Sequence, residues 1–114
     1  MSVYLVIDWQ VPRGHEAETD AALAAVRDHI AASHRQIRSV RVTRELAEDK
    51  SQLGYRWEER YDCLADSQSV DLSEECDEEW LQVWHVAVPG THRQSLWDDE
   101  GRSDWLTPTE APSS

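Results

Sequence analysis

A single carboxylate stands on an otherwise aromatic strand face near the middle of the chain. Residues 54–61, GYRWEERY, alternate in character as a half-buried strand does. One face of this strand would carry Tyr55, Trp57, Glu59 and Tyr61. A carboxyl group placed among apolar rings has a raised pKa, which suits it to proton transfer near neutral pH. Glu59 is therefore the first candidate for a catalytic base.

The alternative is that Glu59 is a structural acid with a partner. The neighbouring hairpin strand, expected at residues 36–46, offers three cations: Arg38, Arg41 and Arg44. Cross-strand pairs of opposite charge stabilise a sheet, so each of these arginines is a candidate. A Tyr or Trp donor is a second kind of partner. The sequence leaves the catalytic and the structural interpretation open.

Further aromatic side chains are expected to meet this face. Trp80 and Trp84 are about one helical turn apart in the second predicted helix, and Trp9 is on the apolar face of the first strand. Such rings can stack on a planar ligand or fill the core. Large aromatics in a small core are hard to pack without a gap. The predicted ligand pocket consists of Trp9, Tyr55, Trp57, Tyr61, Trp80 and Trp84.

Two histidines are further candidates for an acid–base role. His29 borders the apolar stripe of the first predicted helix, and His85 lies in the second. Either could reach a pocket as a base, and a structural histidine is the alternative. His15 and His34, at the helix ends, are expected at the surface. The histidines lack the i, i+4 spacing with an acid that a zinc site uses, so neither a metal nor another cofactor is expected.

The charge balance argues against several classes of partner. The chain of 114 residues has 23 acidic and 11 basic side chains, a formal net charge of −12. Such a surface repels phosphate backbones and anionic lipids, so neither nucleic-acid nor membrane binding is expected. Lys50 is the only lysine. An acid-rich, lysine-poor surface is typical of a high-salt cytoplasm, although a GC-rich genome also favours Arg over Lys.

The N-terminus and the cysteines indicate a compartment. The first residues, MSVYLVIDWQ, contain no basic stretch, and their apolar run is too short for a signal peptide or a membrane span. Cys63 and Cys76 are interpreted as reduced thiols, with a disulfide as the alternative. We therefore expect a soluble, cytoplasmic protein.

Hydrophobic periodicity predicts six elements followed by a tail. Strands are expected at residues 3–11, 36–46, 54–61 and 91–97, and helices at 15–34 and from 72 to about 88. The stretch 81–88, LQVWHVAV, also fits a strand. The apolar spacing before it favours a helix that is stopped by Pro89 and Gly90. Residues 98–114 are predicted to form an acidic, polar tail.

The order β-α-β-β-α-β predicts an α+β fold of the ferredoxin-like type in residues 1–97. Four strands would form one antiparallel sheet with both helices on one face. Tyr4 and Val6 make the other face partly apolar. A second copy of the chain, related by a two-fold axis, is the simplest cover for that face. The sequence thus predicts a homodimer through the sheet face.

Four short motifs resemble a known group of proteins. They are WQVPRGHEAETDAAL at the first strand–helix junction, SVRVTREL after that helix, YRWEERYDCLAD in the third strand, and CDEEW with VPGTHRQSLW near the end. Spread over residues 3–97, they resemble the dimeric α+β barrel superfamily, particularly its antibiotic biosynthesis monooxygenase-like and Nipsnap-like domains. The resemblance implies a small apolar cavity between the sheet and the helices of each subunit. Glu59 matches the acidic position that recurs in the family's third strand.

The activities that this resemblance implies differ among members of the group. Some oxygenate electron-rich aromatic polyketides without metal or flavin, some degrade haem, and others have no known reaction. The haem-degrading members resemble each other through an Asn, a Trp and a His, whereas this chain contains no Asn. We expect a cofactor-independent monooxygenase-like protein that acts on or binds a small aromatic or quinol-type molecule. The alternative is a non-catalytic homodimer that binds a small ligand or is purely structural.

Overall fold

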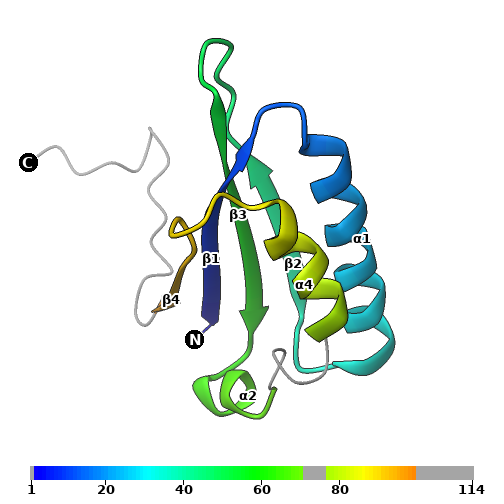
Figure 1. The fold of residues 1–114 in the computed structure, drawn as a ribbon. Coiled ribbons are helices and arrows are strands. Elements are labelled where there is room, and N and C mark those ends of the chain that lie inside the picture. The colour runs from blue at the N-terminus through cyan, green and yellow to red at the C-terminus, as the bar shows by residue number, and fades with distance from the viewer. Residues whose placement is uncertain (1, 71–76, 100–114) are drawn as a thin grey trace, which may run out of the picture.

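One four-stranded sheet, covered on one face by two helices, makes up the fold (Figure 1). The computed structural model describes residues 2–70 and 77–99. The sheet contains the strands β1 (Val3–Pro12), β2 (Ser39–Arg44), β3 (Gln52–Tyr61) and β4 (Arg93–Asp98). The helices are α1 (Glu16–Ser33), α2 (Leu64–Gln68) and α4 (Asp77–Val86). Helices α1 and α4 lie side by side against the sheet, and the short α2 lies beyond the end of β3 (Figure 1).

The strands are arranged in the order β2-β3-β1-β4, and all neighbours are antiparallel. The two central strands pair along their whole length, from Val3 opposite Tyr61 to Pro12 opposite Gln52. A slip of one residue would turn every apolar side chain of a strand to the other face, so burial specifies this register. The predicted ferredoxin-like α+β fold is confirmed, with both long helices on one face.

Strand alternation gives the sheet two faces of different character. We call the side toward α1 and α4 the inner face and the opposite side the outer face. On the two central strands, the buried inner-face residues are Val3, Ile7, Trp9, Val11, Leu53, Tyr55, Trp57, Glu59 and Tyr61. The outer face mixes aromatic, apolar and charged residues: Tyr4, Val6, Asp8, Arg56, Glu58 and Arg60.

Helix α1 packs on the inner face through one stripe of its surface. The buried residues of the stripe recur at helical spacing: Thr19, Leu23, Val26 and Ile30. Glu16 and Glu18 lie in the first turn, where the helix dipole favours acidic side chains. Gly14, in the turn before the helix, has a φ of +100°, a conformation that glycine adopts at little cost. No helix among the described residues is long and apolar enough to cross a membrane.

The ambiguous stretch 81–88 belongs largely to helix α4, which ends at Val86. Trp80 and Val83 are buried whereas Leu81 is exposed, which is the pattern of a helix with one face in the core. The helical alternative is therefore confirmed over residues 77–86. Residues 71–76, where the second helix is predicted to begin, and residues 100–114 of the predicted tail lie outside the described part of the chain.

The structure adds one short helix and corrects one local prediction. Residues 64–68, which lie between the predicted third strand and the predicted second helix, form the short helix α2. His34, expected at the surface, is buried. It caps the end of α1, where the chain turns back toward β2, and its ring lies 5.9 Å from that of His29. A residue at the end of a helix is therefore not always exposed, and neighbouring side chains cover His34 here.

Candidate functional site

Glu59 lies on the inner face of the sheet, in the middle of three hydrogen-bonded strands. Its neighbours across the ladder are Leu5 on β1 and Val40 on β2. The side chain is 0% exposed. The Glu59 side chain points toward the core because alternate residues of a strand share a face, and Trp57 and Tyr61 on that face are buried in the core. The fold thus holds a carboxyl group under the helices, as the sequence predicts.

One hydrogen bond from a tyrosine supports this carboxyl group. The Tyr61 hydroxyl donates to Glu59 Oε1 at 3.2 Å. Glu59 Oε2 is buried and has no hydrogen-bond partner among the described residues. Burial raises the pKa of Glu59 from 4.5 to about 7, and the nearby Trp57 N–H and Tyr61 hydroxyl oppose that rise in part. Of the two contacts, only that of Tyr61 has hydrogen-bond geometry, since the Trp57 N–H has no partner.

The predicted arginine partners do not reach Glu59. Arg38 pairs with Asp62 at 2.8 Å, and Arg44 lies 3.6 Å from Asp20. Arg41 pairs with Glu58, the residue beside Glu59, at 3.2 Å. That arginine lies on the outer face because it follows Val40, which occupies the inner position opposite Glu59. The expectation of an arginine partner was wrong, and the alternative of a tyrosine donor is the arrangement observed.

The six predicted pocket residues belong to one core between the sheet and helix α4, and ring contacts join all of them except Tyr61. Trp9 stacks on Tyr55 at a centroid distance of 5.7 Å. Trp57 meets Trp80 edge-on at 5.1 Å. Trp80 and Trp84 stack at 5.3 Å, and Trp84 meets Trp9 edge-on at 5.4 Å. These contacts are the offset and edge-to-face geometries that aromatic rings prefer.

The same core also contains polar atoms without partners among the described residues. The indole N–H groups of Trp9 and Trp57 are buried and donate no hydrogen bond to another described residue. Together with Glu59 Oε2, three buried polar atoms on one sheet face therefore lack partners within the described residues. Buried polar groups are nearly always paired with protein, water or ligand. Two donors and one acceptor are thus available to a polar molecule that enters the inner face.

The two candidate histidines lie on the helices and do not join Glu59. His85 is exposed near the end of α4. His29 is partly buried, and its Nδ1 lies 3.8 Å from Glu79 Oε1. Neither histidine makes a hydrogen bond or an ion pair with Glu59 in the described part of the chain. The structure therefore brings Glu59 together with the six aromatic residues and leaves His29 and His85 apart from it.

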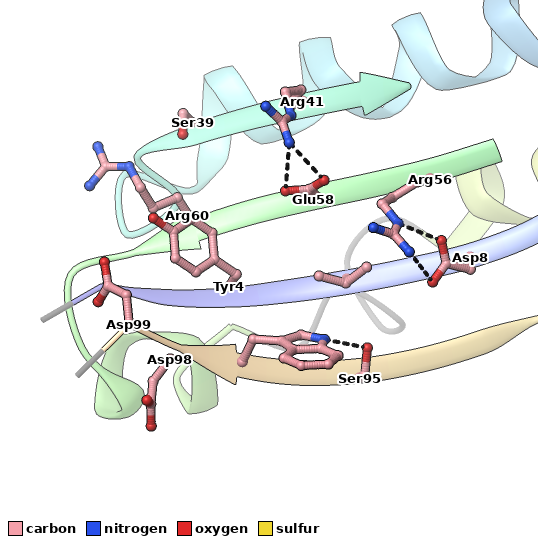
Figure 2. Close-up of a pocket in the computed structure, with 12 residues that line it drawn as sticks. Tyr4, Asp8, Ser39, Arg41, Arg56, Glu58, Arg60, Ser95, Asp98 and Asp99 are labelled. Atoms are coloured by element: carbon pink, nitrogen blue, oxygen red, sulfur yellow. Dashed lines mark hydrogen bonds and ion pairs between the residues drawn. The ribbon is translucent and has the colours of Figure 1, made fainter. Parts of the chain in front are cut away.

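A concave region lies on the outer face, which sequence reasoning treated only as a dimer surface. It is a groove of about 740 Å³ across all four strands (Figure 2). We call it the outer groove, and it is lined by Tyr4, Val6, Asp8, Ser39, Arg41, Arg56, Glu58, Arg60, Ser95, Trp97, Asp98 and Asp99. The alternation of small, aromatic and charged residues at every second position of β1 and β3 was the signal for it. Glu59 is not among its lining residues, since it points to the other side of the sheet.

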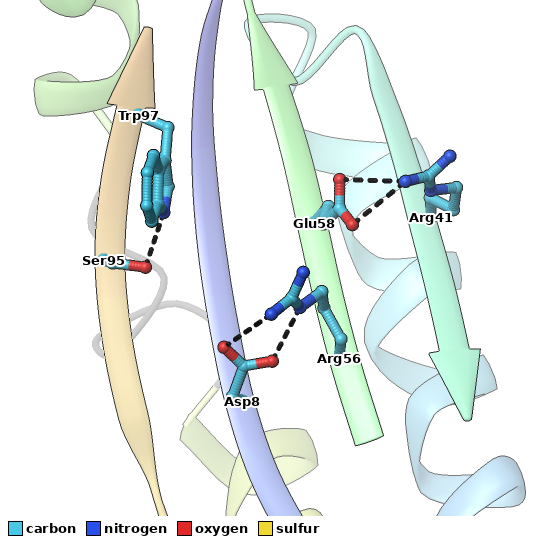
Figure 3. Close-up of polar contacts among 6 residues, drawn as sticks. All are labelled: Asp8, Arg41, Arg56, Glu58, Ser95 and Trp97. Atoms are coloured by element: carbon cyan, nitrogen blue, oxygen red, sulfur yellow. Dashed lines mark hydrogen bonds and ion pairs between the residues drawn. The ribbon is translucent and has the colours of Figure 1, made fainter. Parts of the chain in front are cut away.

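Charges in the outer groove pair within the chain. Arg56 contacts both carboxylate oxygens of Asp8, with the shorter distance 2.7 Å (Figure 3). Arg41 contacts both oxygens of Glu58 in the same way (Figure 3). Cross-strand neighbours in the same sheet thus neutralise both Arg56 and Glu58 within one chain. That Arg56, Glu58 and Arg60 pair across the two-fold axis of a dimer stays a prediction.

The described part of the structure contains no arrangement of side chains suited to a metal centre. No group of three or more of its His, Cys, Asp and Glu side chains is placed to hold a metal ion. Cys63 is a free thiol. Cys76 lies outside the described residues. The chemistry available on the inner face is therefore that of a protonatable carboxyl group, indole donors and aromatic surface.

Solved structures with the same fold connect it to monooxygenase-like proteins. A protein from Bordetella bronchiseptica assigned as an antibiotic biosynthesis monooxygenase superposes with a TM-score of 0.64 at 17% identity, covering 85% of this chain and 95% of that chain. A similarly assigned protein from Caulobacter crescentus gives a TM-score of 0.67 at 11% identity, covering 85% and 88%. The fold of this chain is that of antibiotic biosynthesis monooxygenase-like proteins.

A third similar structure has a stated activity. SnoaB from Streptomyces nogalater, a cofactor-independent oxygenase, superposes in a point-mutant form with a TM-score of 0.62 at 15% identity, covering 85% of this chain and 91% of that chain. No protein-family model matches the sequence, and no curated protein matches it. At these identities the likeness establishes the fold, and the predicted Nipsnap-like relationship stays a prediction.

Proposed function

We propose that this protein is a cofactor-independent monooxygenase-like enzyme acting on a small aromatic or quinol-type molecule. The substrate would bind between the sheet and the helices, against the six aromatic residues of the inner face. Glu59 would be the base. The single observation that carries the proposal is the state of this residue: a fully buried carboxyl group, unneutralised by any described arginine, with a pKa near 7.

The proposed chemistry needs only a base and a protected aromatic site. The Glu59 carboxylate takes a proton from a phenol-type or enol-type group of the substrate, using Oε2, the oxygen without a partner among the described residues. The substrate anion is electron-rich and reacts with oxygen itself. One oxygen atom enters the substrate as a carbonyl group and the other leaves as water, so two hydrogen atoms of a ring methylene are replaced. The rings of Trp57 and Tyr55 would orient the planar substrate.

Tyr61 is proposed as a positioning residue for this base. Its hydroxyl donates to Oε1, which holds the carboxyl group in one orientation and leaves Oε2 for the substrate. Burial and the neighbouring carboxyl group raise the pKa of Tyr61 well above its ordinary value, so it stays a donor throughout the neutral range.

A non-catalytic module is the second candidate, and the close packing around Glu59 favours it. Trp9, Trp57, Tyr61 and Glu59 are all at most 1% exposed, so the inner face is filled in this structure. A ligand would enter only after side chains such as the half-buried Trp84 move aside. A core that never opens would make Glu59 a structural acid held by Tyr61.

Oxygen uptake by variants of the purified protein distinguishes the two functions. Wild-type protein is mixed with hydroxyanthrones and with quinols, and oxygen consumption and ligand-induced quenching of tryptophan fluorescence are followed. Under the proposal, Glu59→Gln abolishes oxygen uptake because an amide accepts no proton in this range, yet it still binds the substrate. Glu48→Gln, at an exposed carboxylate in the β2–β3 loop, is the matched control and keeps full activity. If the wild-type protein neither consumes oxygen nor binds any of these compounds, the protein is the structural module.

We further propose that the protein is a homodimer formed through the outer face. Two structures with this fold, from Bacteroides fragilis and Jannaschia, are dimeric ferredoxin-like proteins. A second copy of the chain could cover this face without separating its main ion pairs, because these form within one chain. They are Asp8 with Arg56 and Arg41 with Glu58. Trp97 on β4 is 61% exposed beside the groove and would be buried by a second copy.

Light scattering after size-exclusion chromatography tests the dimer. The wild type is expected at twice the mass of the chain, and Trp97→Glu at the mass of one chain, because a charge replaces the exposed ring. Leu46→Glu, at an even more exposed residue in the β2–β3 loop, should leave the mass unchanged. A monomeric wild type at high micromolar concentration would contradict the proposed assembly.

A further inference from the structure

A continuous series of aromatic rings crosses the inner face from Glu59 to the surface. It begins at Trp57, the next inward residue on the strand that carries Glu59, and each ring lies close to the next. Trp57 is 5.1 Å from Trp80, Trp80 is 6.4 Å from Trp9, and Trp9 is 5.7 Å from Tyr55, measured between ring centroids. We call these four residues, Trp57, Trp80, Trp9 and Tyr55, the aromatic relay.

Trp84 adds a branch that connects the aromatic relay to solvent. Its ring lies 5.3 Å from Trp80 and 5.4 Å from Trp9, so it bridges the longest step of the series. Unlike the four relay residues it is only half-buried, and it touches the exposed His92 at a centroid distance of 4.4 Å. An oxidant in solution can therefore reach the series at Trp84.

The far end of the aromatic relay has an acceptor for a proton. The Tyr55 hydroxyl donates to Asp20 Oδ1 at 3.3 Å. Asp20 is 57% exposed and lies 3.6 Å from Arg44, which is the other charged group beside the phenol. A tyrosine loses an electron easily only if its phenolic proton can leave at the same time. Asp20 meets that requirement and can pass the proton on to water.

We propose that the aromatic relay carries an oxidising equivalent from the Glu59 end of the core to Tyr55 at the Asp20 edge. Indole and phenol rings are among the side chains that lose one electron most readily. Electron transfer slows exponentially with distance, so rings in near contact exchange electrons much faster than rings separated by aliphatic residues. At neutral pH a tyrosyl radical is lower in energy than an indole radical, which makes Tyr55 the end point. The relay would thereby keep reactive species from damaging the buried site.

This role of the aromatic relay rests on the proposed function, because the oxidant would be a peroxyl radical of the substrate. A substrate peroxyl radical that escapes the normal reaction takes one electron from Trp57 and one proton from the Glu59 carboxylic acid, and it becomes a hydroperoxide. The relay returns an electron to Trp57. The O–H bond of Tyr55 breaks, its electron enters the relay, and its proton goes to Asp20. A soluble thiol at the surface then loses one electron to the nearby Tyr55 radical and its proton to water, and Asp20 returns its proton to restore the phenol.

Pulse radiolysis with azide radicals tests the relay without any substrate. Each azide radical removes one electron from an accessible indole and becomes azide. All proteins carry Trp97→Phe and Trp105→Phe, so that the remaining indoles are Trp84 and those of the relay. We expect the indole-radical absorption to convert into tyrosyl-radical absorption in a first-order step whose rate does not depend on protein concentration. Trp9→Phe, which removes the ring next to Tyr55, and Tyr55→Phe should each abolish that conversion.

The controls assign the end point and keep the test independent of folding defects. Tyr61→Phe, which leaves the relay intact, should retain the conversion. Asp20→Asn changes only an exposed side chain and should slow the conversion, whereas Glu18→Gln on the same helix should not. The proposal is overturned if conversion persists in Tyr55→Phe, if it is lost in Tyr61→Phe, or if Asp20→Asn matches the wild type. Because no substrate is present, these outcomes do not depend on whether the oxygenase assay succeeds.

Discussion

Glu58 and Glu59 are adjacent in the chain, yet the two faces of the sheet give them opposite surroundings. Glu58 lies on the outer face, where Arg41 contacts both of its carboxylate oxygens. Glu59 lies on the inner face, where a neutral hydroxyl from Tyr61 contacts one oxygen and the other has no described partner. The same residue type is thus neutralised by a cation on one side of the strand and shifted toward the protonated form on the other.

The difference shows how burial without charge compensation raises the pKa of a carboxyl group. On the outer face, solvent and arginine side chains surround the carboxylates of Asp8 and Glu58. On the inner face, desolvation is opposed only by a hydroxyl and a nearby indole, and the pKa of Glu59 rises to about 7. An arginine on the inner face would have kept this acid ionised and inert. Four substitutions test the contrast.

Trp57→Ala should have the largest effect, because it removes a ring from the tightly filled inner face. Trp57 is 0% exposed and packs edge-on against Trp80. Truncation of a buried aromatic side chain lowers the free energy of unfolding by about 3–5 kcal/mol. Urea denaturation measures the change. Leu46→Ala, at a residue that is 93% exposed, is the control and should stay within about 0.5 kcal/mol of the wild type.

Glu59→Gln should change how stability depends on pH. Because the folded-state pKa is raised from 4.5 to about 7, the folded protein binds more protons than the unfolded chain between these values. The stabilising contribution is fully present below pH 4.5 and is lost as pH rises to about 7, at up to roughly 1.4 kcal/mol per pH unit. Glutamine does not titrate, so the variant should lack this slope and be the more stable protein at about pH 8.

The difference in unfolding free energy between Glu59→Gln and the wild type isolates this single titration from all others. It is measured by urea denaturation at several pH values across the window. Glu48→Gln, with an exposed carboxylate, should show the same pH dependence as the wild type. A difference that does not vary with pH would mean that Glu59 titrates as an ordinary surface acid.

Tyr61→Phe should have a smaller effect on stability, and it tests what the Tyr61 hydroxyl contributes to the pKa of Glu59. Removal of its hydrogen bond to Glu59 costs about 1.5–3 kcal/mol where the carboxylate is charged and about 1 kcal/mol where it is protonated. The same change removes a group that lowers the pKa of Glu59, so the pKa should move further up. The carbonyl stretch of the protonated carboxyl group, followed by infrared spectroscopy against pH, reports that shift. An unchanged midpoint would show that the hydroxyl does not influence the carboxyl group.

Glu58→Gln should have the smallest effect of the four. Its partner Arg41 is 71% exposed, and solvent-exposed ion pairs contribute about 0–1 kcal/mol. The loss should diminish further at high salt, because salt screens the pair. Denaturation in low and high salt measures it. A loss as large as that of Trp57→Ala would mean that the outer face is more strongly buried than the single chain shows.

The strand and helix periods by themselves determined which residues face the core. The alternation in GYRWEERY placed Glu59 among aromatic rings, and the apolar spacing in α1 predicted its buried stripe. Both are local properties, because the side-chain direction in a strand or helix repeats with the backbone. The β-α-β-β-α-β order then followed from the succession of elements, and it is the fold observed. The stretch 81–88 was harder, because short apolar runs fit both periods.

Only the tertiary structure decided which charged side chains pair and that Glu59 lacks a cationic partner among the described residues. Three arginines on β2 and its flanks looked equally suited to Glu59, but the register of β2 on β3 puts Val40 opposite it and gives Arg41 to Glu58. Register depends on strands that are distant in sequence and on the packing of a whole face. For the same reason, neither the ion pairs that line the outer groove nor the order of rings from Trp57 to Tyr55 could be read from the sequence. Local periodicity sets the direction of each side chain, and the assembled sheet sets its neighbours.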